Sequence, residues 1–262
     1  MSPSAETPVS PAADQPDLRV SEVSVRFGGV QALDGVGLDV RAGRVSGLIG
    51  PNGAGKTTLF NVITGMERPN HGRVELLGRD VTGLAPHRRA RLGLARTFQR
   101  LEVFGSLSAR DNILAAAEFR QGWARDGSHP RQVTEEIVDQ VGLRAVADSR
   151  VDSLPTGLAR LVELGRALAT RPRVLLLDEP GSGLDTDETA VLADLLLGLA
   201  AGGMAVLLVE HDVDLVMRIC DPVCVLDFGR VIATGSPKQV QVDPAVQAAY
   251  LGAGADLIEQ AL

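Results

Sequence analysis

The sequence has 262 residues, of which 45% are hydrophobic and only 3% aromatic, and it carries a formal net charge of -7. This length suits one large α/β domain, or a core with a small subdomain, packed through aliphatic side chains. The acidic balance argues against a protein that coats nucleic acid. No segment approaches the roughly 18 consecutive apolar residues of a membrane-spanning helix. We therefore expect any role at a membrane to depend on a partner.

Short apolar runs bounded by charges or glycines predict the strands, and longer amphipathic segments predict the helices. We expect strands at residues 23–27, 38–40, 45–49, 74–77, 174–177, 205–209, 223–226 and 231–234. We expect helices at residues 56–64, 111–119, 134–141, 158–169 and 187–199. Strands that alternate with helices predict a largely parallel α/β sheet. Residues 101–169 are predicted to be a mostly helical insertion between strands of that sheet.

A glycine-rich loop lies between the strand and the helix predicted at 45–49 and 56–64. It matches the pattern G-x-x-x-x-G-K-[ST], and glycines let the backbone N–H groups of such a loop turn toward phosphate oxygens. The dipole of the following helix adds positive potential. Lys56 is predicted to reach the terminal phosphates and the Thr57 hydroxyl to ligate Mg²⁺. The predicted ATP-binding loop consists of Gly50, Pro51, Asn52, Gly53, Ala54, Gly55, Lys56, Thr57 and Thr58.

Two carboxylates follow the apolar run at 174–177. Asp178 and Glu179 come at the C-terminal end of a predicted buried strand, which is where α/β proteins bind their ligands. Asp178 is predicted to hold Mg²⁺ through water, and Glu179 to polarise the water that attacks the phosphate. Glu179 is therefore the first candidate catalytic residue.

With these two motifs, residues 20–252 resemble the nucleotide-binding subunit of an ATP-binding cassette (ABC) transporter. The resemblance implies a P-loop NTPase (RecA-like) core with a mostly parallel sheet, an N-terminal antiparallel β subdomain and an inserted α-helical subdomain. It also implies roles for four single residues. Phe27 would stack on adenine, and Gln99 would ligate Mg²⁺ and sense the membrane partner. Asp185 would lie in a loop that communicates across a dimer, and His211 would contact the γ-phosphate as a second catalytic residue.

The family's signature loop is altered in this chain. The usual Leu-Ser-Gly-Gly-Gln is replaced by Leu-Pro-Thr-Gly-Leu at 154–158, so the serine hydroxyl and the glutamine are missing. Gly157 and the start of the next helix remain to face a phosphate. Thr156 could cap that helix or supply the missing hydroxyl. In the family this loop contacts ATP bound to the opposite subunit, which implies a head-to-tail dimer.

Residues 96–104 and 243–252 resemble one branch of the family, the ATPases of branched-chain and related hydrophobic amino acid importers. This resemblance implies transmembrane permease subunits, a second ATPase subunit, identical or not, and an extracytoplasmic solute-binding protein as partners. It implies no nucleic acid. The expected location is the cytoplasmic side of the membrane, held there by the permease. An importer for another small solute such as urea or an amide, a non-transport ABC ATPase, and a module that binds ATP without hydrolysing it are the alternatives.

The domain boundaries follow from composition and from the resemblance. We expect a disordered tail at residues 1–17 without the features of a signal peptide, an ATPase domain at 18–252 that includes the helical subdomain at about 101–169, and a C-terminal tail at 253–262. The basic cluster at 87–91 is interpreted as a solvated helix face, and Asp227-Phe228-Gly229 as a hairpin turn. Cys220 and Cys224 are expected to be free thiols without a metal.

Overall fold

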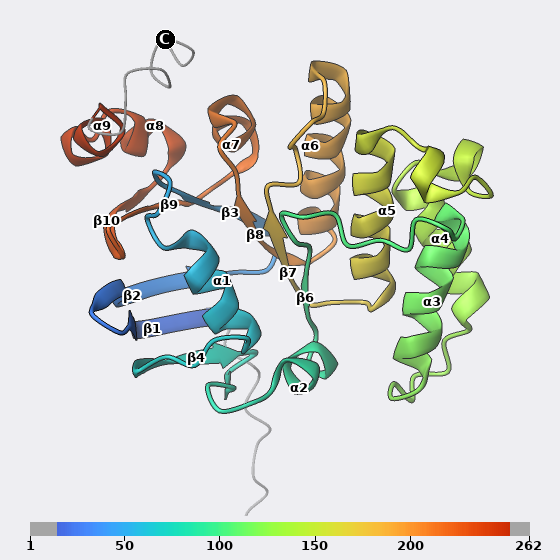
Figure 1. The fold of residues 1–262 in the computed structure, drawn as a ribbon, viewed down its shortest axis with the longest axis horizontal. Coiled ribbons are helices and arrows are strands. Elements are labelled where there is room, and N and C mark those ends of the chain that lie inside the picture. Colours follow the sequence, from blue (N-terminus) through green and yellow to red (C-terminus); the bar gives the residue numbers. More distant parts are fainter. Residues whose placement is uncertain (1–14, 252–262) are drawn as a thin grey trace, which may run out of the picture.

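The computed structural model describes residues 15–251, which form two β-sheets with helices around them (Figure 1). The smaller sheet is antiparallel, with the strand order β2-β1-β4-β5. Its strands are β1 (Leu18–Phe27), β2 (Val30–Val40), β4 (His71–Leu76) and β5 (Arg79–Asp80). Along the first half of β1, buried residues alternate with more exposed ones. One face of this sheet therefore packs on the core, as is usual for antiparallel sheets.

The larger sheet has the order β10-β9-β3-β8-β7-β6 and is parallel except for β10, which forms a hairpin with β9. Its strands are β3 (Arg44–Ile49), β6 (Leu94–Arg96), β7 (Val174–Asp178), β8 (Ala205–Val209), β9 (Val223–Asp227) and β10 (Arg230–Gly235). Every residue of β7 and β8 is buried, as expected for strands covered on both faces.

The register of the parallel strands brings their C-terminal ends to one edge. Leu48 of β3 and Asp178 of β7 both pair with Val209 of β8. The loops that follow these three strands begin at Gly50, Glu179 and Glu210, so residues far apart in the sequence meet at this edge.

The helices lie on both sides of the larger sheet. Around it are α1 (Lys56–Thr64), α2 (Pro86–Arg91), α6 (Thr186–Ala201), α7 (Val213–Ile219), α8 (Pro237–Gln241) and α9 (Pro244–Leu251). The segment between β6 and β7 contains α3 (Ala109–Gln121), α4 (Pro130–Gln140), α5 (Thr156–Ala169) and 3-10 turns at Arg144–Val146 and Val151–Ser153. Figure 1 shows α3, α4 and α5 gathered at one end of the molecule. The predicted fold class, including the inserted helical subdomain, is confirmed.

Alternate residues of the parallel strands belong to two apolar clusters, one on each face of the larger sheet. Leu175 and Leu177 pack with α5, α6 and the helical subdomain, whereas Val174 and Leu176 pack with α1 and the antiparallel sheet. The parallel sheet is therefore the middle layer, and α1 is held between it and the smaller sheet. Within the described residues, no helix is long and apolar enough to cross a membrane.

The structure bears on the predicted basic cluster and on the predicted tails. The basic cluster at 87–91 forms α2, and His87, Arg88 and Arg91 are exposed, but Arg89 is only 1% exposed. The expectation of a wholly solvated face is wrong for Arg89, because its guanidinium binds four backbone carbonyls beneath the helix. Of the two predicted tails, residues 1–14 and 253–262 lie outside the described residues. Asp17, at the boundary we chose, accepts a hydrogen bond from the Ala42 N–H at 2.8 Å.

Candidate active site

The glycine-rich loop is shaped by close contacts that admit no side chain at two of its positions. Gly50 has φ +151°, and a Cβ there would lie 1.9 Å from the Leu226 carbonyl oxygen. Gly55 has φ +108°, and a Cβ there would lie 2.8 Å from the Ala32 carbonyl oxygen. The loop is thus pressed between the β9–β10 hairpin and strand β2. Only glycine permits this path, and the path leads directly into α1.

The start of α1 is open to an anion. Gly55 stands at the N-cap without a side-chain cap, and the first turn has no acidic residue. The first N–H groups of the helix therefore carry positive potential that no side chain of the first turn offsets. Asn52, Gly53 and Thr57 are exposed at this end of the helix, while Pro51 and Thr58 are partly buried and Ala54 is buried. Such an end suits a phosphate.

Lys56 lies folded over this loop. Its ammonium donates to the carbonyl oxygen of Gly50 at 2.5 Å and to that of Pro51 at 3.0 Å. Burial lowers the pKa of Lys56, while the charges of Glu179 and Asp178 act in the opposite direction. The two carboxylates predicted to prepare the metal and the water are thus close enough to influence the lysine predicted to bind phosphate.

Asp178 ends β7 with a side chain only 5% exposed, and its carboxylate accepts from Arg96 Nη2 at 2.8 Å. Arg96 also donates to Asn61 Oδ1 at 2.7 Å, and its guanidinium lies near the rings of Phe60 and Phe98. Arg96 had no predicted role of its own. Arg96 compensates the buried charge of Asp178, which an isolated carboxylate could not keep at this depth.

Glu179 follows Asp178 in a left-handed conformation with φ +51°. For a residue other than glycine this backbone geometry costs on the order of 1–3 kcal/mol, and such residues concentrate at functional sites. Its N–H donates to the Val209 carbonyl at 2.9 Å. Its Oε2 accepts from Gln99 Nε2 at 3.0 Å. Two residues predicted from separate motifs are therefore in direct contact.

His211 follows β8, and its side chain is 64% exposed. Its Nδ1 lies 4.0 Å from Glu179 Oε2 and 3.6 Å from Glu210 Oε2. Glu210 is 3% exposed and accepts the N–H groups of Gly181 at 2.6 Å and of His211 at 3.1 Å. Burial raises the pKa of Glu210, whereas these hydrogen bonds and His211 act to lower it. Glu210 ties the loop after Glu179 to the loop of His211.

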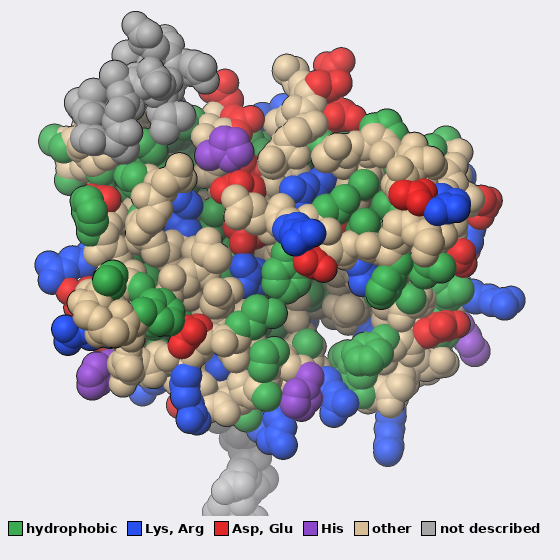
Figure 2. Space-filling view, viewed as in Figure 1, with side chains coloured by type: hydrophobic (Ala, Val, Ile, Leu, Met, Phe, Trp, Pro, Cys, Tyr) green, Lys and Arg blue, Asp and Glu red, His purple; other side chains and the backbone are tan. Residues whose placement is uncertain are grey.

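Sequence reasoning did not single out Glu210, although one signal was available. Glu210 directly follows a continuous apolar run, as Asp178 ends the run of β7. Figure 2 shows acidic side chains beside a histidine in the upper part of the face in view.

The residues predicted to hold Mg²⁺ offer a donor set of the right chemistry. Thr57 has a hydroxyl, Gln99 an amide oxygen and Asp178 a carboxylate, and hard cations prefer oxygen ligands. Within residues 15–251, no group of three or more His, Cys, Asp or Glu side chains is arranged to hold a metal. A site with few protein ligands is typical of Mg²⁺, which keeps several waters and binds substrate phosphates.

Phe27 ends β1 and is 49% exposed. It belongs to the β1–β2 hairpin, whose second strand meets the phosphate loop at Ala32 and Leu33, next to Gly55. The aromatic ring predicted to stack on adenine is thus carried by an element that packs against this loop.

The residues expected to act across a dimer form a second group. Thr156 is the first residue of α5, follows Pro155 at the N-cap and makes no capping hydrogen bond, so the expectation that it caps this helix is wrong. Gly157 is buried, and a Cβ there would lie 2.7 Å from the Glu188 carboxylate. Asp185 caps α6 in a reciprocal capping box with Glu188. Figure 1 shows α5 beside α6, with β7 between α5 and α1.

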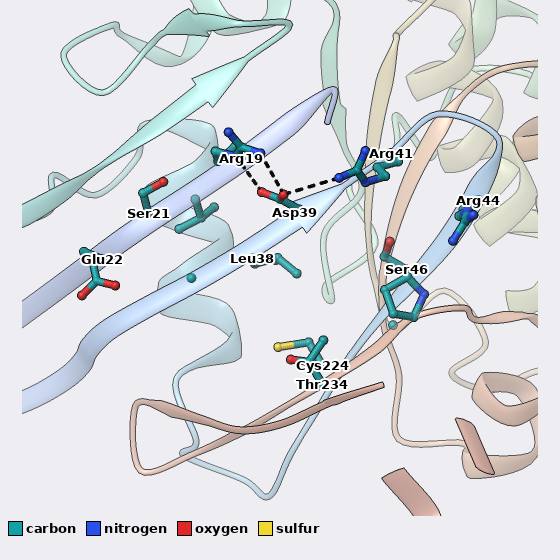
Figure 3. Close-up of a pocket in the computed structure, with 14 residues that line it drawn as sticks. Arg19, Ser21, Glu22, Leu38, Asp39, Arg41, Arg44, Ser46, Cys224 and Thr234 are labelled. Carbon is teal, nitrogen blue, oxygen red and sulfur yellow. Dashed lines mark hydrogen bonds and ion pairs between the residues drawn. The ribbon is translucent and has the colours of Figure 1, made fainter. Parts of the chain in front are cut away.

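A sizeable cavity among the described residues lies elsewhere. It has a volume of about 480 Å³ between the antiparallel sheet and β3, and its walls include Arg44, Ser46 and Cys224. Figure 3 shows Arg19 and Arg41 directed at Asp39 on its rim. None of the predicted site residues lines this cavity. The candidate active site lies instead at the C-terminal edge of the parallel strands, around Gly50, Asp178, Glu179 and His211.

Comparison with known proteins agrees with this geometry. Residues 33–182 match the family described as ABC transporter, and residues 230–256 match the family described as branched-chain amino acid ATP-binding cassette transporter. This chain belongs to the ABC transporter family. It is an ATP-binding, ATP-hydrolysing transporter subunit, and it has the fold of the family's P-loop core.

Relatives and solved structures cover most of this ABC subunit. The high-affinity branched-chain amino acid transport ATP-binding protein BraF of Pseudomonas aeruginosa is 39% identical over 91% of this chain and 98% of its own length. The lipopolysaccharide export system ATP-binding protein LptB of Acidithiobacillus ferridurans is 40% identical over 83% of this chain and 89% of its own length. A solved ATP-binding cassette, MJ1267, superposes with a TM-score of 0.81 at 32% identity, over 90% of this chain and 99% of its own.

Proposed function

We propose that this ABC subunit binds ATP at residues 50–58 and hydrolyses it with Glu179 as the group that takes the proton of the attacking water. The observation that carries the proposal is the contact of 3.0 Å between Glu179 Oε2 and Gln99 Nε2, at the same edge as the phosphate loop. A carboxylate oriented by one hydrogen bond retains lone pairs for a water, which is the requirement for a general base.

The other residues divide the remaining tasks. The N–H groups at the start of α1 and the Lys56 ammonium would bind the phosphates and stabilise their charge in the transition state. His211, largely exposed and 4.0 Å from Glu179, is placed to reach the terminal phosphate as a further donor. Phe27 would stack on the adenine. Catalysis here consists of positioning and electrostatic stabilisation.

Mg²⁺ would be held by Thr57, Gln99 and Asp178, the last through water. When bound, the ion neutralises part of the phosphate charge. Arg96 would hold Asp178 in place beneath this position, since its guanidinium donates to the carboxylate at 2.8 Å.

A second ATPase subunit would complete the site. Thr156 and Gly157 lie at the N-terminal end of α5, close to Glu188, which shares a capping box with Asp185 at the start of α6. In a head-to-tail pair these residues would contact the nucleotide of the partner. The Thr156 hydroxyl makes no capping bond and remains available to the γ-phosphate.

The cargo we propose is a branched-chain or related hydrophobic amino acid. The match of residues 230–256 to the branched-chain family and the similarity to BraF, a branched-chain amino acid transport ATP-binding protein, support it. The ATPase would work at the cytoplasmic side of the membrane, held by permease subunits, and an extracytoplasmic binding protein would deliver the cargo.

The hydrolytic proposal is tested with Glu179→Gln in the full chain, assayed for phosphate release with its permease present. We expect the variant to lose at least 100-fold in kcat, to retain ATP binding and to dimerise in Mg-ATP by light scattering. The exposed Glu118→Gln is the control and should match the wild type. Equal rates for wild type and Glu179→Gln would overturn the proposed mechanism.

A second candidate is a subunit of an export system, because LptB is 40% identical. Copurification of the chain with its permease, followed by uptake of labelled leucine into vesicles, separates the two. Leucine uptake that depends on ATP supports the importer. Copurified export components without uptake support the second candidate.

A further inference from the structure

The segment that carries Gln99 has no regular structure of its own. Residues 97–104 form neither helix nor strand, so their backbone N–H and C=O groups must find partners elsewhere. Three side chains of α5 bind the backbone of Phe98, Gln99 and Glu102, while Asn112 of α3 binds that of Phe104. Arg160, Glu163 and Arg166 are spaced three residues apart, which places them along one side of the helix.

Glu163 is the centre of this arrangement. Its Oε1 accepts the N–H of Phe98 and the N–H of Glu102, both at 3.3 Å, and its Oε2 lies 3.3 Å from Arg160 Nη1. The side chain is only 6% exposed. Burial raises the pKa of Glu163, and the two N–H groups and Arg160 act to lower it. Separating Glu163 from these partners would leave its buried carboxylate without compensation. The contacts therefore stabilise the packing of residues 97–104 against α5.

The two arginines hold the carbonyl side of the same segment. Arg160 donates to the Phe98 carbonyl at 3.1 Å and to the Gln99 carbonyl at 2.7 Å. Arg166 donates to the Glu102 carbonyl, and its guanidinium lies 4.7 Å from the centre of the Phe104 ring. A continuous series of contacts therefore runs from α5 through the backbone of Gln99 to its side chain, and from there to Glu179.

We propose that Arg160 and Glu163 are positioning residues that fix Gln99 against Glu179. The inference rests on the proposed function, in which Glu179 promotes hydrolysis. Because α5 begins at Thr156 and Gly157, anything that holds this end of the helix acts on the backbone of Gln99 about one helical turn away. Engagement of the partner's nucleotide would thus set the geometry of Glu179 in the subunit that supplies the loop. The two sites of the pair would be coupled through α5.

The direct test is Glu163→Gln in the full chain with its permease. The amide keeps one oxygen for the N–H groups but loses the ion pair with Arg160. We expect kcat to fall about tenfold and KM for ATP to stay within about twofold, because the phosphate loop is untouched. Arg160→Lys keeps the charge but loses the fork that reaches two carbonyls, and it should act in the same direction. Glu118→Gln, the same chemical change at an exposed position of α3, should change nothing.

A double-variant cycle separates positioning from general destabilisation. If Glu163 acts through Gln99, adding Glu163→Gln to Gln99→Ala should lower kcat no further than Gln99→Ala alone. If the double variant instead loses kcat by the product of the two single losses, Glu163 acts independently of Gln99 and the proposal is overturned.

Amide hydrogen exchange gives a readout that needs no hydrolysis. In Glu163→Gln the amides of Phe98 and Glu102 should exchange at least tenfold faster, while those of α1 stay unchanged. Unchanged exchange at both amides would refute the positioning role, whatever the ATPase rate. A wild type that does not hydrolyse ATP, but whose Phe98 and Glu102 amides respond as expected, would refute the proposed function and leave the tie between α5 and this segment standing. If Glu163→Gln loses its fold, Arg160→Lys provides the same measurements.

Discussion

Arg89 joins α2 to the helix of the phosphate loop, and its replacement by methionine tests that role. The guanidinium donates to the carbonyl oxygens of Val62 and Ile63 in α1 at 2.6 and 2.7 Å. It also donates to those of Leu84 and Thr82 at 3.0 and 2.9 Å. Arg89→Met keeps the aliphatic stem and removes all four donors. Val62 retains the N–H of Gly65, but the other carbonyls lose a charged partner in a buried setting.

The expected loss is about 3–5 kcal/mol of the free energy of unfolding, because each buried carbonyl left without a partner costs on the order of 1 kcal/mol or more. For a chain of this size such a loss lowers Tm by about 10 °C. Urea and thermal unfolding followed by circular dichroism measure it. Arg88→Met, one residue away and exposed, is the matched control and should stay within about 0.5 kcal/mol. A loss below about 1 kcal/mol for Arg89→Met would refute the reasoning.

The remaining predictions concern other sites. Gly50→Ala places a Cβ 1.9 Å from the Leu226 carbonyl and should weaken ATP binding more than 100-fold by calorimetry; tight binding would contradict the contact. Gly198 is exposed on α6 with open space around it, so Gly198→Ala should raise the free energy of unfolding in urea by about 0.5–1 kcal/mol. A lower free energy of unfolding would contradict a helical conformation at this position. Burial raises the pKa of Glu210, so its ionised form destabilises the fold increasingly as pH rises through that pKa. The stability of Glu210→Gln relative to the wild type should therefore improve from pH 5 to pH 8, and the opposite trend would mean that the raised pKa is wrong.

Local patterns predicted the elements that build the core of the fold. The ranges expected for α1 and β8 coincide with those observed, since α1 is bounded by Gly55 and Gly65 and β8 is a continuous apolar run. Strands β5 and β6 have only two and three residues, too few for a period to be visible. Helices α7, α8 and α9 have only seven, five and eight residues, too few to show a clear helical period in the sequence.

The candidate site divides in the same way. The phosphate loop and Asp178–Glu179 could be recognised because backbone geometry and strand position impose a local sequence pattern. Arg96, Glu163 and Glu210 could not, since each is defined by a partner distant in sequence. Arg96 meets Asp178 across 82 positions, and Glu163 meets Phe98 across 65. Nothing in the sequence around a buried charge tells which backbone groups surround it.

Three buried side chains hold the loops at this edge of the sheet together. Arg96 fixes Asp178, Glu210 joins the loops of Gly181 and His211, and Glu163 holds the segment of Gln99. Each is a buried polar side chain whose removal leaves its hydrogen-bond partners unsatisfied, so each resists displacement more than an apolar contact would. Under the proposed function, the exposed side chains of His211 and Thr57 would contact the nucleotide and its metal. A site with fixed carboxylates and exposed donors is organised for a ligand that brings its own charge, as ATP does.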